Sequence, residues 1–238
     1  MYDVVRSFGI DYIFFDIAFL ALFIFLLAKS KAKIPIVAIF IGGLINFLID
    51  WGIWYKLTDI REISISNTFL PFLSLGLKVF VFFVWFSISY GLEYAWVFLM
   101  FDKKANKIKW TVILFSGWIL VAFLSQLVPL NDANIITIRH MGSLRIWRIV
   151  IVLVGYLLLL ILGYKWKKIG CLFLIGFAVH FMMEFSLLIT GIRPGSSLIL
   201  LENSLVEFNM GMPIFYLFYD KILKKRSFKI GPKAIDKG

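Results

Sequence analysis

The sequence predicts an all-α membrane protein, a bundle of seven transmembrane helices, and three observations lead to this fold class. Of 238 residues, 61% are hydrophobic and only 16% are charged. With a mean hydropathy of +0.93, a soluble domain would expose large apolar patches, so the apolar surface is expected to face lipid. The apolar residues also gather in segments of about 20 residues, the length that crosses roughly 30 Å of hydrocarbon. No polar stretch is long enough for a separate soluble domain, so residues 1–238 are expected to form one integral membrane domain.

The predicted spans lie near residues 11–28, 34–54, 74–101, 110–130, 146–164, 169–191 and 200–220. The third apolar stretch begins at Phe69 and is too long for one straight span. Pro71 and Gly76 are therefore expected to separate a short interfacial piece from the span itself. The seventh span contains Gly211 and Pro213, which predict a kink.

Basic residues give the expected orientation of the bundle. Of the 25 lysines and arginines, 17 fall in the loops after the first, third and fifth spans and in the C-terminal tail, residues 221–238. The opposite side has seven, which are Arg6, Lys56, Arg61, Arg139, Arg145, Arg148 and Arg193. Since basic loops stay in the cytoplasm, the N-terminus is expected outside and the tail inside, against anionic lipid. The net charge of +11 therefore indicates no nucleic-acid partner, and the expected location is a bacterial or archaeal cytoplasmic membrane.

Three predicted spans each carry a polar pair spaced four residues apart: Asn46 with Asp50, His180 with Glu184, and Asn203 with Glu207. Four residues make just over one helical turn, so the members of a pair share one helix face. A carboxyl group at bilayer depth costs about 2.5 kcal/mol or more to insert, so it is seldom kept without a use. The expected topology places the pairs at overlapping depth, which predicts one acidic pocket inside the bundle.

Asp50 and Glu207 are the candidate catalytic acids. Burial favours the protonated form of a carboxyl group, and only that form can donate a proton. Asn46, Asn203 and Asn209 are expected to position these acids or to maintain their protonation. The alternatives are a solvated aspartate at the end of a span for Asp50, and a structural hydrogen bond to a neighbouring helix for Glu207.

The third pair, His180 and Glu184, makes a weak metal site because it offers two ligands only. An interhelical hydrogen-bond network is the favoured interpretation, and lining the pocket or passing protons is the alternative. Glu93 is expected nearer the cytoplasm, where it either pairs with a basic residue or lines the deep end of the pocket.

Trp51 and Trp54 lie near the acids, and aromatic faces stabilise cations by about 0.5–2 kcal/mol. An acidic pocket with aromatic walls therefore suits a reaction that passes through carbocations.

Several absent motifs narrow the function. The sequence has no D-D-x-x-D or N-D-x-x-D motif, so Mg²⁺-dependent ionisation of a prenyl diphosphate is not expected. The seventh span has no internal lysine for a retinal Schiff base, since Lys221 lies at its end. A single cysteine, Cys171, leaves no disulfide within the chain and no cysteine metal cluster. We therefore predict no metal and no other cofactor.

These features together resemble the membrane-integral terpene cyclases of the fungal meroterpenoid type, which also occur in bacteria. Members of that family are small, have seven helices and use no metal. One carboxylic acid on helix 2 and one on helix 7 are thought to start the reaction by protonating an epoxide or alkene. Asp50 and Glu207 occupy comparable places, and Asn46 resembles the family's asparagine one turn before the helix-2 acid. The chain also departs from the family pattern, which has glutamate on helix 2, aspartate on helix 7 and a tryptophan before the helix-2 acid. Here Trp51 follows Asp50.

The resemblance implies metal-independent, proton-initiated cyclisation of a membrane-dissolved polyprenyl substrate, terpenoid or meroterpenoid. The alternative from another class is a non-catalytic lipid-handling protein or a proton-coupled transporter, in which the acids form a proton relay or a cation site. A purely structural subunit is the third interpretation. The expected partners are membrane lipids and the lipophilic substrate.

Overall fold

The computed structural model of this chain describes residues 3–223, apart from residues 129–132, 141, 143 and 196. The expected basic tail, residues 221–238, lies almost entirely outside the described residues. In the described part most residues are helical, and five helices are long and apolar enough to cross a membrane. These are α1 (Ile10–Lys29), α2 (Lys33–Phe47) with the π-helix η1 that continues it (Leu48–Leu57), α3 (Leu75–Phe101), α4 (Lys107–Leu127) and α6 (Trp166–Ile189).

The other two predicted spans are also helical, but each differs from a simple span. The helix α5 (Leu144–Ile161) has a shorter apolar part, Ile146–Ile161. The last span is divided into α7 (Ser197–Val206), the 3₁₀ turn η2 (Phe208–Met210), α8 (Met212–Phe218) and the π turn η3 (Tyr219–Leu223). The break falls at Gly211, and Pro213 lies in the first turn of α8, where a missing N–H costs no helical bond. The kink predicted from these two residues is confirmed.

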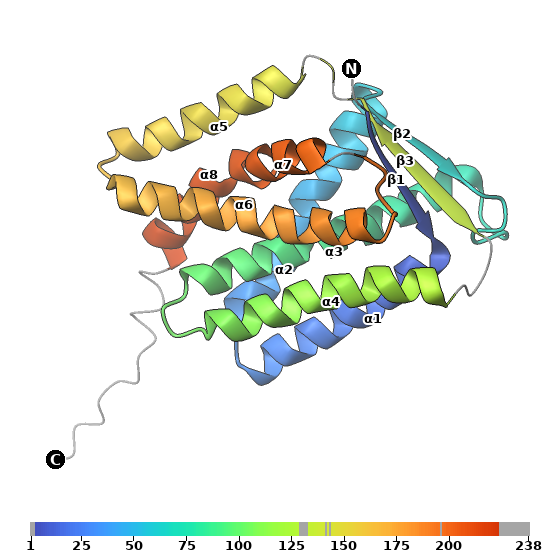
Figure 1. Ribbon diagram of the computed structural model, residues 1–238, viewed down its shortest axis with the longest axis horizontal. Coiled ribbons are helices and arrows are strands. Elements are labelled where there is room, and N and C mark those ends of the chain that lie inside the picture. Colours follow the sequence, from blue (N-terminus) through green and yellow to red (C-terminus); the bar gives the residue numbers. More distant parts are fainter. Residues whose placement is uncertain (1–2, 129–132, 141, 143, 196, 224–238) are drawn as a thin grey trace.

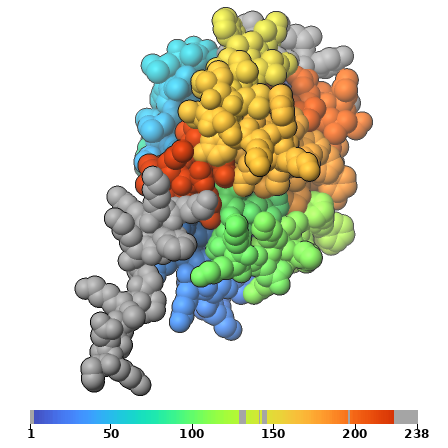
Figure 2. All heavy atoms as spheres, turned by 90° about the vertical axis from the view of Figure 1, so that its left-hand side faces the viewer, coloured from blue at the N-terminus to red at the C-terminus, as the bar shows by residue number. Residues whose placement is uncertain are grey.

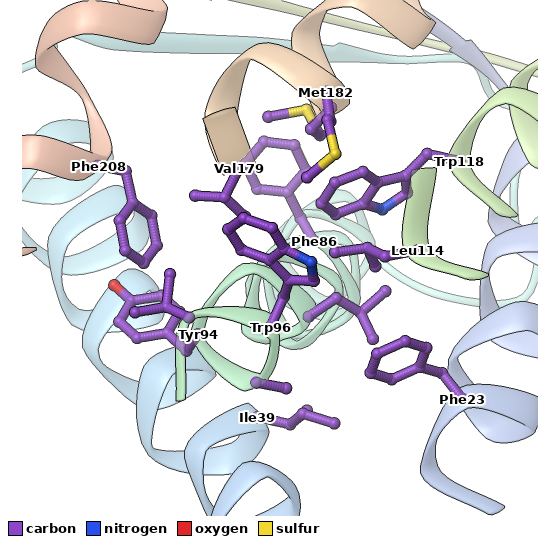
Figure 3. Packing of buried hydrophobic residues seen from close by; sticks show 14 of the residues in the cluster. Phe23, Ile39, Phe86, Tyr94, Trp96, Leu114, Trp118, Val179, Met182 and Phe208 are labelled. Atoms are coloured by element: carbon purple, nitrogen blue, oxygen red, sulfur yellow. The ribbon is translucent and has the colours of Figure 1, made fainter. Parts of the chain in front are cut away.

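The break predicted before the third span is also confirmed. Residues 67–73 form turns and bends, and α3 begins at Leu75. From Gly91 to Phe101 every residue of α3 is buried, so this helix is surrounded by others. Figure 3 shows Trp96 of α3 in one apolar core with Leu114 of α4 and Val179 of α6.

The prediction of an all-α protein missed a three-stranded antiparallel sheet with the strand order β1–β3–β2. Its strands are β1 (Val4–Gly9), β2 (Arg61–Ile65) and β3 (Asn134–Arg139). Each strand has only five or six residues and lies outside the predicted spans. Short strands leave no mark on a hydropathy profile averaged over 20 residues, so the sequence analysis treated these segments as loops.

The inner face of the sheet carries three arginines. Side chains alternate between the two faces of a strand, and the buried positions include Arg6, Arg61 and Arg139. Across the sheet, Arg139 is opposite Arg61 on one side and opposite Val4 on the other, while Arg6 is opposite Thr137. The pairing therefore directs one arginine from each strand toward the helices.

The sheet crosses one end of the helices, and the connections α1–α2, α3–α4 and α5–α6 lie at the opposite end (Figure 1). Figure 2 looks onto that opposite end, with the α1–α2 region in blue, α3–α4 in green and α5–α6 in yellow and orange. Lysines such as Lys29, Lys104 and Lys167 lie in or beside these connections. The loops that were predicted to be cytoplasmic thus share one end of the molecule.

Two glycines allow α2 and α3 to approach closely. A Cβ added to Gly91 would lie 2.3 Å from the carbonyl oxygen of Ile39, and one added to Gly42 would lie 2.3 Å from the ring of Tyr94. Small residues at such contacts let helix backbones approach each other in membranes.

Replacing Gly91 by alanine is expected to lower the free energy of unfolding by about 1–3 kcal/mol, because the methyl group meets a backbone that cannot rotate away. The matched control is Gly76→Ala in the same helix, where an added Cβ meets nothing within 4 Å. That variant is expected to be neutral or to gain up to about 1 kcal/mol of helix propensity. Unfolding in mixed micelles with rising SDS measures both, and equal stabilities would contradict the close α2–α3 contact.

The outer edge of the sheet carries a histidine between two acids. His140 Nε2 lies 2.9 Å from Glu62 Oε1, and His140 Nδ1 lies 3.2 Å from Asp3 Oδ2. The hydrogen bonds to Glu62 and then Asp3 raise the pKa of His140 above its ordinary 6.5. All three side chains are exposed, so water and salt screen the interaction.

The pKa of His140 is higher in the folded protein than its ordinary 6.5, so its pairing stabilises the sheet fully below pH 6.5. This stabilisation is lost as the pH rises through the pKa of His140 in the folded protein. Titration of His140 by NMR is expected to give a pKa above 6.5 that falls in Glu62→Gln. The control is Ser64→Ala, an exposed position two residues along the same strand. A pKa at or below the ordinary value in the unchanged protein would refute the pairing.

Candidate functional site

A cavity of about 160 Å³ lies between the sheet arginines and the helices. Its walls come from α2, η1, α3, α6, the α7–α8 break, α8 and two strands. Its charged or titratable lining residues are Asp50, Arg61, Tyr90, Glu93, Tyr94, Arg139, His180 and Glu207. It therefore joins groups that are far apart in the sequence into one polar chamber.

Six of the ten side chains selected from the sequence line this cavity: Asn46, Asp50, Trp54, Glu93, His180 and Glu207. Four do not: Trp51, Glu184, Asn203 and Asn209. Trp51 stacks on Phe47, with ring centroids 5.0 Å apart.

Asp50 lies on the π-helix η1, in contact with the sheet. Its Oδ1 accepts a hydrogen bond from Arg61 Nη2 at 2.6 Å, and both side chains are buried. The Arg61 guanidinium also lies over the Trp54 ring, 5.7 Å from its centroid. Asn46, which the sequence analysis expected to orient Asp50, instead accepts a hydrogen bond from the Tyr94 hydroxyl at 3.3 Å. The group that holds Asp50 is therefore an arginine from β2.

Glu207 lies at the break between α7 and η2. Arg139 donates to both of its oxygens, from Nη2 to Oε1 at 2.5 Å and from Nη1 to Oε2 at 3.2 Å. Arg148 of α5 also donates to Oε1. The Arg139 guanidinium lies 5.1 Å from the centroid of the Trp54 ring. Two always-charged guanidinium groups thus hold this carboxylate.

Glu184 lies behind the cavity wall and is fully buried. It accepts a hydrogen bond from Arg6 Nη2 at 2.5 Å and forms an ion pair with Arg193. Arg6 also donates to the Tyr90 hydroxyl. Glu184 therefore anchors β1 to α6 and does not face the chamber.

Glu93 and His180 form a separate pair on the cavity wall. His180 Nδ1 lies 3.2 Å from Glu93 Oε1 and 3.5 Å from Glu93 Oε2, and this contact joins α6 to α3. On its other side His180 Nε2 lies 3.4 Å from Glu184 Oε1. Both Glu93 and His180 are almost fully buried.

Neither asparagine of the seventh span lines the cavity. Asn209 accepts a hydrogen bond from the Tyr156 hydroxyl at 2.6 Å and donates to the carbonyl oxygens of Phe173 and Leu205. Asn203 is buried in α7, and its backbone carbonyl oxygen accepts a hydrogen bond from the backbone N–H of Glu207 at 2.8 Å.

The arginines contributed to the predicted membrane orientation of the bundle but were not predicted to lie in the pocket. A signal was present, because six of the seven basic residues assigned to the outer side are arginine, whereas 16 of the 17 on the other side are lysine. Arginine is the preferred partner of buried carboxylates because its planar fork matches their geometry. The missed site residues are Arg6, Arg61, Arg139, Arg148 and Arg193.

A second hollow, an apolar groove of about 400 Å³, adjoins the cavity. It runs along α2 from Lys33 to Ile45, about 18 Å at 1.5 Å per residue, and its other walls are α3 and α8. Among the described residues of its lining, Lys33 alone is charged. Three residues line both hollows: Ile45, Tyr94 and Phe215.

Aromatic rings form the partition between the groove and the cavity. Tyr94 lies edge-on to Phe208 and Phe215, with ring centroids 5.1 Å and 4.9 Å away. Figure 3 shows Tyr94 and Phe208 side by side at one edge of the apolar core. On the outer wall of the groove, Val37 and Ile41 are about half exposed, so the groove is open along its side.

Comparisons with known proteins add no assignment. No family model, no curated protein and no solved structure matches this chain. Among the described residues, no three His, Cys, Asp or Glu side chains are grouped as metal ligands would be. A functional assignment therefore has to come from the cavity, the groove and the chemistry of their lining.

Replacing Arg61 by methionine is expected to lower the free energy of unfolding by about 3–5 kcal/mol, because Asp50 is then left as an unpaired buried charge. The double variant Asp50→Asn, Arg61→Met is expected to recover part of this loss. Lys56→Met, at an exposed position of the same π-helix, is the control and is expected to be neutral. Unfolding in SDS-containing micelles measures all three, and a single variant as stable as the control would contradict the buried pair.

Proposed function

We propose that this chain is a membrane enzyme that cyclises a polyprenyl substrate, terpenoid or meroterpenoid, by proton-initiated chemistry without a metal. The observation that carries the proposal is the adjoining of a charged cavity and an apolar groove, which share Ile45, Tyr94 and Phe215. Such a pair of hollows fits an amphiphile whose hydrocarbon chain lies in the groove and whose polar end reaches the charged chamber.

The proposal includes the full topology. All seven predicted spans would cross the membrane, with the N-terminus and the sheet outside and the C-terminus in the cytoplasm. The clustering of the lysine-rich connections at the end opposite the sheet supports this orientation. The cavity then lies in the outer half of the bilayer of a bacterial or archaeal cytoplasmic membrane, and the groove opens sideways to lipid.

The cavity wall suits carbocation chemistry. Trp54, Tyr90, Tyr94 and Phe208 present aromatic rings to it, and such faces stabilise cations most strongly where water is excluded. Asp50 and Glu207 supply carboxylates at the same wall, where negative charge stabilises a developing cation. The resemblance to the terpene cyclases gives these two acids the central role in the reaction.

The proposal predicts that the purified protein, with EDTA present, converts farnesyl- or geranylgeranyl-bearing substrates into cyclic isomers. Asp50→Asn and Glu207→Gln are expected to lower product formation by about 100-fold or more, because each removes a fixed charge from the reaction chamber. Val37→Trp is expected to raise KM, because its ring fills the groove. Product analysis by mass spectrometry measures these effects.

Two matched controls accompany the experiment. Phe40→Trp lies on the same helix at an exposed position outside the groove, and Lys103→Gln lies in an exposed connection. Both are expected to keep the wild-type rate. Proton-coupled flux in liposomes without any cyclic product would instead favour a transporter and refute the enzyme.

A further inference from the structure

Resting on the proposed function, we propose that the Glu93–His180 pair donates the proton that starts the reaction, and that Asp50 and Glu207 act as fixed counter-charges. A proton donor has to line the chamber, hold a proton near neutral pH and release it without breaking the fold. The carboxyl groups around the chamber differ sharply in these respects.

Three of the four carboxylates are held by arginine. Asp50 is paired with Arg61 at 2.6 Å, Glu207 with Arg139 at 2.5 Å and Glu184 with Arg6 at 2.5 Å. Glu207 and Glu184 each have a second arginine, Arg148 and Arg193 respectively. Guanidinium stays charged in proteins, so each of these acids is committed as an acceptor of charge-assisted hydrogen bonds, which suits a fixed counter-charge.

Glu93 differs from the other three acids. Within the described part of the chain, no lysine or arginine forms an ion pair with it, and its hydrogen-bond partner is His180, at 3.2 Å. The glutamate is 2% exposed and the histidine 3% exposed, and both line the cavity. A buried carboxylate without a cationic partner is costly, whereas a glutamic acid beside a neutral imidazole, or the charge pair formed by moving the proton, is neutral overall.

This pair also suits the charge balance of the reaction. The alkene π electrons, or an epoxide oxygen lone pair, take the proton from the carboxyl oxygen of Glu93, which leaves a carboxylate beside a new carbocation. After ring closure the final cation loses a proton, which returns to the pair, so substrate and product are isomers and the pair is regenerated. His180 accepts or returns this proton through Nδ1, and its Nε2 faces Glu184 at 3.4 Å.

Other charged or titratable groups surround the pair. They are Tyr90, Tyr94, Glu184, Asp50, Glu207, Arg6, Arg61 and Arg139. The arginine pairs occupy the three other carboxylates.

The decisive variant is Glu93→Gln, which keeps the shape of the side chain but has no acidic proton. It is expected to lower kcat by about 100-fold or more with KM nearly unchanged. Asp50→Asn and Glu207→Gln are expected to raise KM as well, because they release the arginines that shape the chamber. Glu93→Asp is expected to restore part of kcat, and His180→Gln is expected to shift the pH profile of kcat. A wild-type kcat in Glu93→Gln would overturn the proposal.

A measurement without substrate separates this proposal from the proposed function. Infrared difference spectra of the purified protein, comparing neutral with alkaline pH, detect the carbonyl stretch of protonated carboxyl groups. The band is expected to lose intensity in Glu93→Gln and His180→Gln, and to persist in Asp50→Asn and Glu207→Gln. A band unaffected in Glu93→Gln but lost in Asp50→Asn would overturn the assignment, whether or not cyclic products are found. Absence of product from every substrate, with the Glu93 band present, would refute only the cyclase.

Discussion

The pairing of buried arginines with buried carboxylates is the constraint on which the rest of this structure depends. Each strand of the sheet sends one arginine to one acid on a different helical element: Arg6 to Glu184, Arg61 to Asp50 and Arg139 to Glu207. An unpaired charge at these depths would cost several kcal/mol, so the sheet and the helices hold each other in register. Displacing a strand by one residue would turn its arginine to the opposite face and separate it from its acid.

The same pairing explains why both acids selected from the sequence lie on irregular helix. Asp50 occupies a π-helix, and Glu207 occupies the break between α7 and η2. Irregular backbone is tolerated at membrane depth where it lines a polar cavity, and π-helices are often found at functional sites. The irregular turns present these carboxylates to the sheet arginines, and the chamber forms between the two sets of charges.

The structure also divides the polar groups of the chamber into two kinds. Asp50, Glu207 and Glu184 are paired with arginines, while Glu93 contacts His180 and forms no ion pair with a lysine or arginine of the described chain. A chamber that needs both a proton source and a lasting negative wall for cations is served by this division. Under the proposed function, the apolar groove beside it, which is open along its side, is the route by which a membrane-dissolved chain would reach the chamber.

The sequence by itself determined the mostly helical class with apolar helices of membrane length, the approximate positions of the helices, the break before Leu75 and the kink at Gly211 and Pro213. These follow from hydropathy, chain length and backbone chemistry, all of which act locally. It also identified six of the cavity-lining side chains, since polar groups in apolar segments stand out.

Only the tertiary structure decided their partners. The strands are too short to be seen in hydropathy, and an arginine at position 6, 61 or 139 meets its acid only after distant segments pair across the sheet. Which buried carboxyl group meets an arginine is therefore a property of the fold, because it depends on where every guanidinium group ends.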